Sequence, residues 1–332
     1  MAAIPASTYI VTQFKHGSPL ISCRFHPAGE HVFFGAQDHG IWRWKIGEEK
    51  AVKFPGHDSW VRGIAFDSQG ETVISAGFDH RLVWSPALDV EPKPIRGVEA
   101  HDGWVRAVAI SPDDKLVAST GNDRLVKLWD FQSGEQLAQL AGHESDVYNV
   151  VFHPSEPRIV SADLKGELID WNYETGEKVR QAKSEALSKY DTGFMAVIGG
   201  VRSMCFNADG SLLACGGITD VTNAFAGVGN PTIEIFDWAE FKLQRHHRSK
   251  EKLKGVAWGV VLHPENFIVG ISGGSGGGHL LFWQPDGEHE FHKLKLPDTA
   301  RDLSLSPNGM DLAIAHYDRH LRIARMAEKP AE

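Results

Sequence analysis

One unit of about forty residues recurs along the 332-residue chain, and this repeat limits the fold more than any other feature. Its opening run appears as GHDSWVRGIAF at 56–66, AHDGWVRAVAI at 100–110 and GHESDVYNVVF at 142–152. Each opening run leads through a polar turn into a short β-branched run, then a Gly/Asp turn, then a run that ends in tryptophan. Alternation with a period of two, interrupted by turn residues, predicts successive short antiparallel strands in every unit.

The residues that end each unit give the number of units. Neighbouring end residues are 40 to 47 positions apart, apart from one interval of 65. They are Trp44, Trp84, Trp129, Trp171, Phe236, Trp283 and Ala324. Units of this length with four strands each are typical of a β-propeller. We therefore predict an all-β fold with seven four-stranded antiparallel blades.

The clearest unit contains GNDRLVKLWD at 121–130 and resembles the consensus of the WD-repeat family. The resemblance implies that a histidine, a hydroxyl, an aspartate and a tryptophan form a hydrogen-bonded tetrad within one blade. Buried groups of this kind need partners, so we assign these residues a structural role and not a catalytic one. The second unit has the same residue types but is one residue short before its tryptophan. The two predicted tetrads are His57, Ser75, Asp79 and Trp84, and His101, Ser119, Asp123 and Trp129.

The other units depart from the tetrad pattern. The first unit has Phe34 where the hydroxyl belongs, and the fourth has Lys165 at the aspartate position. The fifth has Phe236 in place of the tryptophan. We therefore expect packing to hold most of the blades together.

The seventh unit stops near Met326 without an outermost strand, whereas residues 7-15 form a strand-like run ahead of the first unit. In WD-repeat proteins the N-terminal strand commonly completes the last blade, and this closure removes exposed sheet edges. We predict the same closure here and a single domain over 1-332. The expected blades lie near 16-55, 56-97, 100-140, 142-183, 199-250, 253-296 and 299-326, the last together with 7-15.

Charge and cysteine content bear on the class of partner. Lys and Arg number 34 against 43 Asp and Glu, and the net charge of −9 opposes non-specific attraction to nucleic acid or an anionic membrane. The three cysteines lack metal-ligand spacing, and the sequence has no signal-peptide pattern or bilayer-spanning apolar run. We expect a cytoplasmic protein without cofactor, metal or membrane contact. It should be monomeric alone, and membership of a larger complex is left open.

The loops on one face of a propeller surround its central channel, and in the WD-repeat family this top face often binds partners. Alignment of the opening runs places arginines and large aromatic residues there, and these residue types anchor interfaces. The resemblance thus implies a site for a protein or peptide partner, with the arginines favouring an acidic one. A competing interpretation pairs the arginines with Asp58, Asp102 and Asp302. The predicted site consists of Trp60, Arg62, Phe78, Trp104, Arg106, Tyr148, Arg202, Trp258 and Arg301.

The long interval in unit five comes from two extra segments, 184–200 and 218–230. The equivalent turn of unit six is the glycine-rich run 272–279, which we interpret as a flexible blade turn and not as a phosphate loop. Long loops in compact domains are usually functional or disordered. We predict that these loops determine which partner binds. The alternative is that they are mobile loops without a ligand.

A scaffold for protein–protein interaction is the expected function, without catalysis. The sequence contains no GxSxG, no HExxH, no close cysteine pair and no dinucleotide fingerprint. Two alternatives stay open. One is an enzyme or small-ligand binder that uses the channel mouth, and the other is a nucleic-acid binder that uses the basic segment 241-254. Nucleic acid is not the expected partner, because a solvated strand edge that discourages strand pairing is the favoured explanation of that segment.

Overall fold

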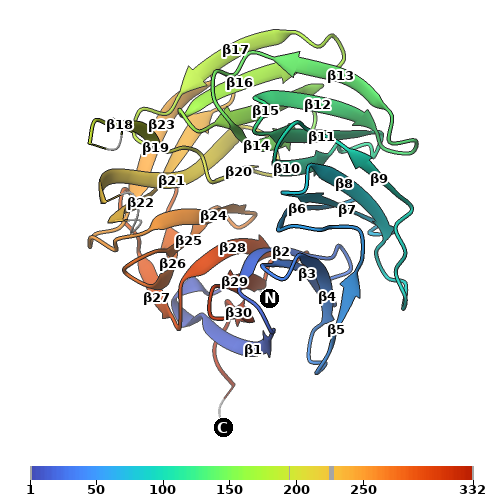
Figure 1. The fold of residues 1–332 in the computed structure, drawn as a ribbon. Coiled ribbons are helices and arrows are strands. Elements are labelled where there is room, and N and C mark those ends of the chain that lie inside the picture. Colours follow the sequence, from blue (N-terminus) through green and yellow to red (C-terminus); the bar gives the residue numbers. More distant parts are fainter. Residues whose placement is uncertain (1, 194, 224–227, 331–332) are drawn as a thin grey trace.

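The computed structural model describes residues 2–193, 195–223 and 228–330, which form a ring of seven four-stranded antiparallel sheets around a central channel (Figure 1). Each sheet is one blade. The first strand of each blade lines the channel, and the last strand lies at the rim. The predicted all-β fold with seven blades is confirmed.

The strands of the blades have the following bounds. Blade one contains β2 (Leu20–Phe25), β3 (His31–Ala36), β4 (Gly40–Lys45) and β5 (Ala51–Phe54), and blade two contains β6 (Val61–Phe66), β7 (Thr72–Gly77), β8 (Arg81–Pro86) and β9 (Arg96–Glu99). Blade three contains β10 (Val105–Ile110), β11 (Leu116–Gly121), β12 (Leu125–Asp130) and β13 (Gln136–Ala141), and blade four contains β14 (Val147–Phe152), β15 (Arg158–Asp163), β16 (Glu167–Asn172) and β17 (Lys178–Lys183). Blade five contains β20 (Ser203–Phe206), β21 (Leu212–Asn223), β22 (Val228–Asp237) and β23 (Lys242–Arg248), and blade six contains β24 (Val256–His263), β25 (Phe267–Gly273), β26 (Gly278–Trp283) and β27 (His292–Leu296). Blade seven contains β28 (Ala300–Leu305), β29 (Asp311–His316) and β30 (His320–Arg325).

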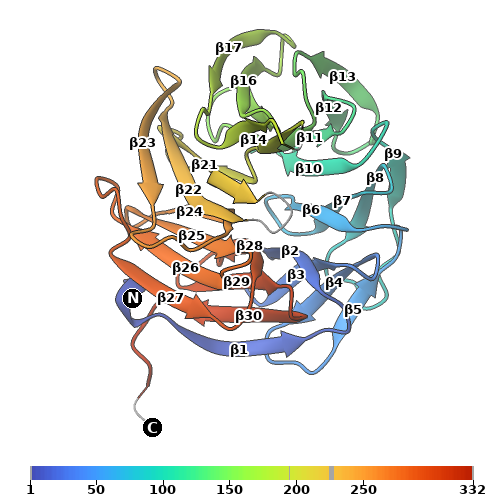
Figure 2. The same cartoon turned by 60° about the vertical axis from the view of Figure 1, so that its left-hand side comes forward.

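The N-terminal strand β1 (Tyr9–Lys15) completes blade seven as its outermost strand. It pairs antiparallel with β30, with Phe14 opposite Leu321, and runs along the rim in Figure 2. A short 3-10 turn, η1 (Pro5–Ser7), precedes it, and the N–H of Ile4 donates to the carbonyl of Met326 at 2.8 Å. The predicted closure is therefore confirmed, and hydrogen bonds join the segments near the two ends of the described chain.

The hydrophobic core lies between neighbouring blades. Between blades five and six, for example, Ile233 and Ile235 pack with Ile268 and Trp283 in one buried cluster. Burial of a large apolar side chain contributes roughly 1.5–3 kcal/mol, so each of these seams adds substantially to stability. Phe14 of β1 stacks on Trp44 of blade one with ring centroids 5.6 Å apart, so the closing strand also takes part in a seam.

In blade three the four predicted tetrad residues lie together. His101 Nδ1 is 2.8 Å from an oxygen of Asp123, and His101 Nε2 is 2.7 Å from the hydroxyl of Ser119. The indole N–H of Trp129 donates to the same hydroxyl at 2.8 Å. The network connects the blade's second and third strands to the loop that precedes its first strand.

The predicted tetrad of blade two is wrong at Trp84. His57 contacts Asp79 at 3.0 Å and Ser75 at 2.8 Å, but the indole N–H of Trp84 donates to the carbonyl of Phe131 in blade three at 3.0 Å. The missing residue explains the difference. Ser75 lies opposite Val83 in the sheet, which puts Trp84 on the other face, because side chains alternate along a strand.

Blade four has a complete tetrad that the sequence interpretation missed, because Lys165 occupies the expected aspartate position. Asp163, two positions earlier, lies 3.2 Å from His143. The hydroxyl of Ser161 is 2.7 Å from His143 and accepts the indole N–H of Trp171 at 2.8 Å. The prediction for this blade was therefore wrong in its aspartate. Lys165 instead pairs with an exposed glutamate in the loop before β14.

Blade one also uses a histidine that the sequence interpretation did not assign. His16 lies 2.8 Å from Asp38, and the indole N–H of Trp42 donates to the other oxygen of that carboxylate at 3.2 Å. With Phe34 in place of the hydroxyl, the indole N–H of Trp44 donates to the carbonyl of Glu48 at 2.8 Å.

Candidate partner-binding surface at the channel mouth

In most blades a β-bulge in the innermost strand presents one residue at the channel mouth. In six blades the register between the first and second strands shifts at the same point, for example between Val61 and Gly63. A bulge leaves one residue unpaired and re-aims its side chain. In blade five, the N–H of Arg202 donates to the carbonyl of Gly216 just before β20. The bulged residues are Ile21, Arg62, Arg106, Tyr148, Trp258 and Arg301.

On one side of the mouth, arginines alternate with aromatic rings. The guanidinium carbon of Arg106 is 4.6 Å from the ring centroid of Trp104 and 4.5 Å from that of Tyr148. Arg202 lies 4.4 Å from Tyr148 and 5.7 Å from Trp258. These distances are within the range of cation–π interactions.

The alternation continues around the mouth. Arg301 is 5.1 Å from the ring centroid of Trp258, and Arg62 is 5.6 Å from it. On the outer side, Phe78 and Trp104 stack with centroids 4.5 Å apart and planes inclined by 2°, and the centroid of Trp60 is 6.1 Å from that of Phe78. The nine predicted residues thus form one connected set.

The structure adds Tyr317, which the sequence interpretation missed. Its ring centroid is 5.2 Å from Arg301, and its side chain is exposed. Tyr317 precedes the turn residue Asp318 just as Phe78 precedes Asp79, so alignment of the turns contained the signal. We call the nine predicted residues together with Tyr317 the mouth surface.

The mouth arginines form no ion pair with any acid in the described part of the chain. Arg106 donates from Nε to the amide oxygen of Asn122 at 2.7 Å, and Arg62 donates to backbone carbonyls. Asp58 pairs with Arg81 at 3.2 Å, away from the mouth arginines. Acidic side chains nevertheless act on the arginines over longer distances, since the charge of Asp302 raises the pKa of Arg62 and that of Asp146 raises the pKa of Arg106. The competing interpretation is therefore supported at Asp302 only, and there without an ion pair.

Burial and the nearness of other positive charges both affect the pKa values of the mouth arginines. Burial lowers the pKa of Arg62, nearby Asp302 opposes this change, and the neighbouring arginines lower the pKa further. Burial also lowers the pKa of Arg106 and of Arg301. Positive charge that has lost water and lies beside like charge is stabilised by an incoming anion.

Comparison with known proteins agrees with this architecture. The pattern of the WD domain, G-beta repeat, matches residues 48–84, 92–130 and 134–168, which lie within blades one to four. The chain contains WD repeats of this family. Within this WD-repeat propeller, the tetrads of blades three and four and the mouth surface follow from the same repeated unit.

Several curated proteins are similar to parts of the WD-repeat propeller. "Transcription initiation factor TFIID subunit 5" of Caenorhabditis elegans is 27% identical over 52% of this chain and 26% of its own length. "Pre-mRNA-processing factor 17" of Homo sapiens is 22% identical over 75% of this chain and 47% of its own length. "Topless-related protein 2" of Arabidopsis thaliana is 26% identical over 62% of this chain and 20% of its own length. The matched region thus spans less than half of each of these relatives.

Both blade-five insertions of the propeller lie beside the mouth surface. The first forms a two-stranded hairpin of β18 (Ser188–Asp191) and β19 (Ala196–Gly199), and the second lengthens β21 and β22. Ile198 of the hairpin and Ile218 and Val221 of β21 pack in one cluster with Val256 and Trp258. Of the predicted segments, residues 194 and 224–227 lie outside the described residues. A specificity role for the insertions stays a prediction.

The strand of the basic segment 241–254 lies away from the mouth. This strand, β23, is the outermost strand of blade five, whereas the mouth surface is carried by innermost strands and top-face loops. Arg245 donates to the backbone carbonyl of Asp286 in blade six. This strand therefore contributes to the contact between two blades at the rim.

Close approach of neighbouring backbone explains why the turn of blade six contains glycines. A Cβ atom on Gly276 would lie 1.8 Å from the carbonyl oxygen of Leu253, and a Cβ atom on Gly278 would lie 2.1 Å from that of Asp298. Glycine is needed where backbones approach this closely.

Among the described residues, no group of three or more His, Cys, Asp or Glu side chains is arranged to hold a metal ion. The described chain has no helix that is long and apolar enough to cross a bilayer.

Proposed function

We propose that this WD-repeat propeller is a non-catalytic scaffold that binds an acidic segment of a protein partner on the mouth surface. One observation carries the proposal. Four arginines face the mouth, stack against aromatic rings and form no ion pair with an acid among the described residues.

The stacking geometry suits carboxylate recognition. A guanidinium that lies over an aromatic ring uses its flat face, and its N–H groups in the plane stay available to a bidentate partner. The aromatic residues offer apolar area at low entropy cost, and Trp60 and Trp104 are 37% and 44% exposed. An acidic segment with an apolar or aromatic side chain fits both features.

The comparisons support a role within an assembly. One relative is named as a subunit of a transcription initiation factor, and another as a pre-mRNA-processing factor. We propose that this chain likewise acts by joining other proteins, with partners of its own. The matched region covers less than half of either relative, so we do not propose that this chain has their activities.

Charge reversal at Arg106 tests the proposal. Arg106 contacts Trp104 and Tyr148 at the centre of the mouth surface, and Arg106→Glu turns an attractive site into a repulsive one. Arg245→Glu, at the rim, is the matched control. Both variants are first checked for native circular dichroism and melting temperature.

Binding to a labelled polyglutamate peptide is then measured by fluorescence anisotropy, and partners are captured from the native cell lysate. We expect wild type and Arg245→Glu to bind the peptide and to capture the same proteins, and Arg106→Glu to lose both. Peptide affinity should fall as salt rises, because screening weakens charge pairing. Equal binding by all three proteins would show that the mouth surface is not the site.

A further inference from the structure

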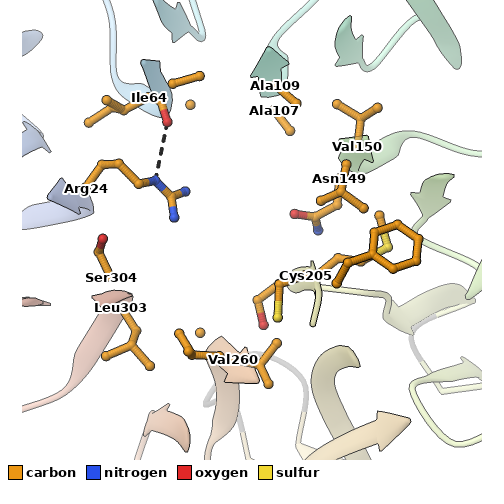
Figure 3. A pocket seen from close by; sticks show the side chains of 18 of the residues that line it. Arg24, Ile64, Ala107, Ala109, Asn149, Val150, Cys205, Val260, Leu303 and Ser304 are labelled. Carbon is orange, nitrogen blue, oxygen red and sulfur yellow. Dashed lines mark hydrogen bonds between the residues drawn. The ribbon is translucent and has the colours of Figure 1, made fainter. Parts of the chain in front are cut away.

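Arg24 lies inside the channel, below the mouth surface. Its guanidinium points into the open channel from β2 (Figure 3). Phe25 and Phe66 end β2 and β6, which places Arg24 level with Ala65, three positions beyond Arg62. At about 3.3 Å per residue, the inner level is about 10 Å along the strand from the mouth.

The inner level is otherwise lined by small or uncharged side chains. At the position of Arg24, the other six innermost strands carry Ala65, Ala109, Val151, Cys205, Val261 and Ser304, all of which line the channel. Side chains of this size leave space around the guanidinium. The channel has a volume of about 720 Å³, which is within the usual range for small-molecule sites.

Arg24 forms no ion pair within the described part of the chain, and Asp302, whose pKa burial raises, is close enough for the charge of Arg24 to lower the pKa of that carboxyl. The Nε of Arg24 donates to the carbonyl of Ile64 at 3.4 Å, which is a long hydrogen bond. Asp302 is the acid among the described lining residues, and its two oxygens accept the backbone N–H groups of Cys23 and Leu303 at 2.9 Å. Arg24, Arg62, Arg106 and Arg202 line the channel against this one acid, so positive charge is in excess.

Arg62 crosses the channel above this space. It extends from blade two, and its guanidinium donates to the carbonyl of Arg202 in blade five at 3.3 Å and to that of Ile21 in blade one at 3.2 Å. Arg62 therefore forms the inner edge of the mouth surface, and we call the part of the channel beneath it, at the inner level, the chamber.

We infer that this chamber binds a phosphorylated small molecule, with the phosphoryl group against Arg24. A phosphoryl group carries about −1.5 to −2 charges and several acceptor oxygens, so it matches the excess of positive charge better than a single carboxylate does. Ile64, Val150 and Val260 supply apolar wall for the organic part of the ligand (Figure 3). A phosphorylated side chain that enters from the mouth offers the same chemistry.

Isothermal titration calorimetry with phenyl phosphate, inorganic phosphate and phenol tests the inference. We compare wild type with Arg24→Gln and with Arg81→Gln, which removes a surface arginine that is paired with Asp58. Wild type and Arg81→Gln should bind phenyl phosphate more tightly than phosphate, and phenol should not bind. Arg24→Gln should weaken phenyl phosphate binding at least about tenfold, as expected for loss of a charge-assisted hydrogen bond.

Further variants and ligands locate the site and the source of the phosphoryl group. If Arg106→Glu abolishes binding while Arg24→Gln does not, the anion lies at the mouth and the chamber is rejected. Absence of phenyl phosphate binding to wild type, or equal loss in Arg24→Gln and Arg81→Gln, also rejects it. A phosphoserine peptide that displaces phenyl phosphate supports a protein-borne phosphoryl group, and failure to displace it supports a free ligand. Neither result depends on the acidic partner of the mouth surface.

Discussion

Arg106 of blade three and Tyr148 of blade four are joined at the channel mouth, with the guanidinium carbon 4.5 Å from the ring centroid. Both residues occupy the bulge of their innermost strands, so neighbouring blades meet through side chains that the bulge re-aims. The contact that joins these two blades at the mouth is thus made by groups that are proposed to bind the partner.

This pair should show measurable coupling. In a double-mutant cycle with Arg106→Ala and Tyr148→Ala, we expect the two changes in unfolding free energy to be non-additive by about 1 kcal/mol, as for a partly desolvated cation–π pair. Chemical denaturation of the four proteins measures it. Additive effects would show that the two side chains do not interact in solution.

The tetrads predict a difference between two serines in equivalent positions. Ser119→Ala removes the acceptor of the Trp129 indole N–H and the partner of His101, so it should destabilise the protein by about 2 kcal/mol. Ser75→Ala should cost less, because the indole of Trp84 bonds elsewhere. Denaturation midpoints of the two variants, measured side by side, check the order, and a larger effect at Ser75 would contradict it.

The sequence predicted the features that depend on the repeat itself. The number of blades and the closure by β1 follow from the spacing of the end residues and from the incomplete last unit. Errors arose where one blade departs locally from the pattern. At Trp84 a single missing residue places the side chain on the opposite face of the sheet. In blade four the aspartate, Asp163, lies two positions earlier than expected but still contacts His143.

Two features of the channel could not be predicted from the sequence. The mouth residues were found because their opening runs align, whereas Arg24 lies in the first unit, which has no GH opener to align. The crossing of Arg62 from blade two to blade five depends on the width of the closed ring, and no sequence spacing contains it.

The closing strand predicts a contrast between its two faces. Phe14 packs on Trp44 and Phe34 in the seam with blade one, so Phe14→Ala should lower the free energy of unfolding by about 2 kcal/mol, since the side chain is partly buried. Val11 of the same strand is exposed, and Val11→Ala should change it by less than about 0.5 kcal/mol. Urea denaturation measures both variants. Equal effects would show that β1 does not pack in the seam as described.

Glu234 predicts a pH-dependent stability. It lies fully buried in β22 opposite Cys215, with His246 Nδ1 3.4 Å from Oε1, and burial raises its pKa from 4.5 to about 7. Ser184, the backbone at Ala186 and Arg248 oppose this rise. Between pH 4.5 and about 7 the folded protein holds a proton that the unfolded chain has lost, so this group's contribution to stability falls as pH rises through that window.

Glu234→Gln removes the titration while keeping the shape of the side chain. We expect the variant and wild type to differ little at pH 4.5, and the variant to gain relative stability up to about pH 7, by about 3 kcal/mol at most. Above that pH the carboxylate is charged in both states and the difference should stay constant. Glu240→Gln, on the exposed turn between β22 and β23, is the control and should follow wild type at every pH. If the curves of unfolding free energy against pH for Glu234→Gln and wild type run parallel from pH 4.5 to 8, Glu234 does not titrate in this window.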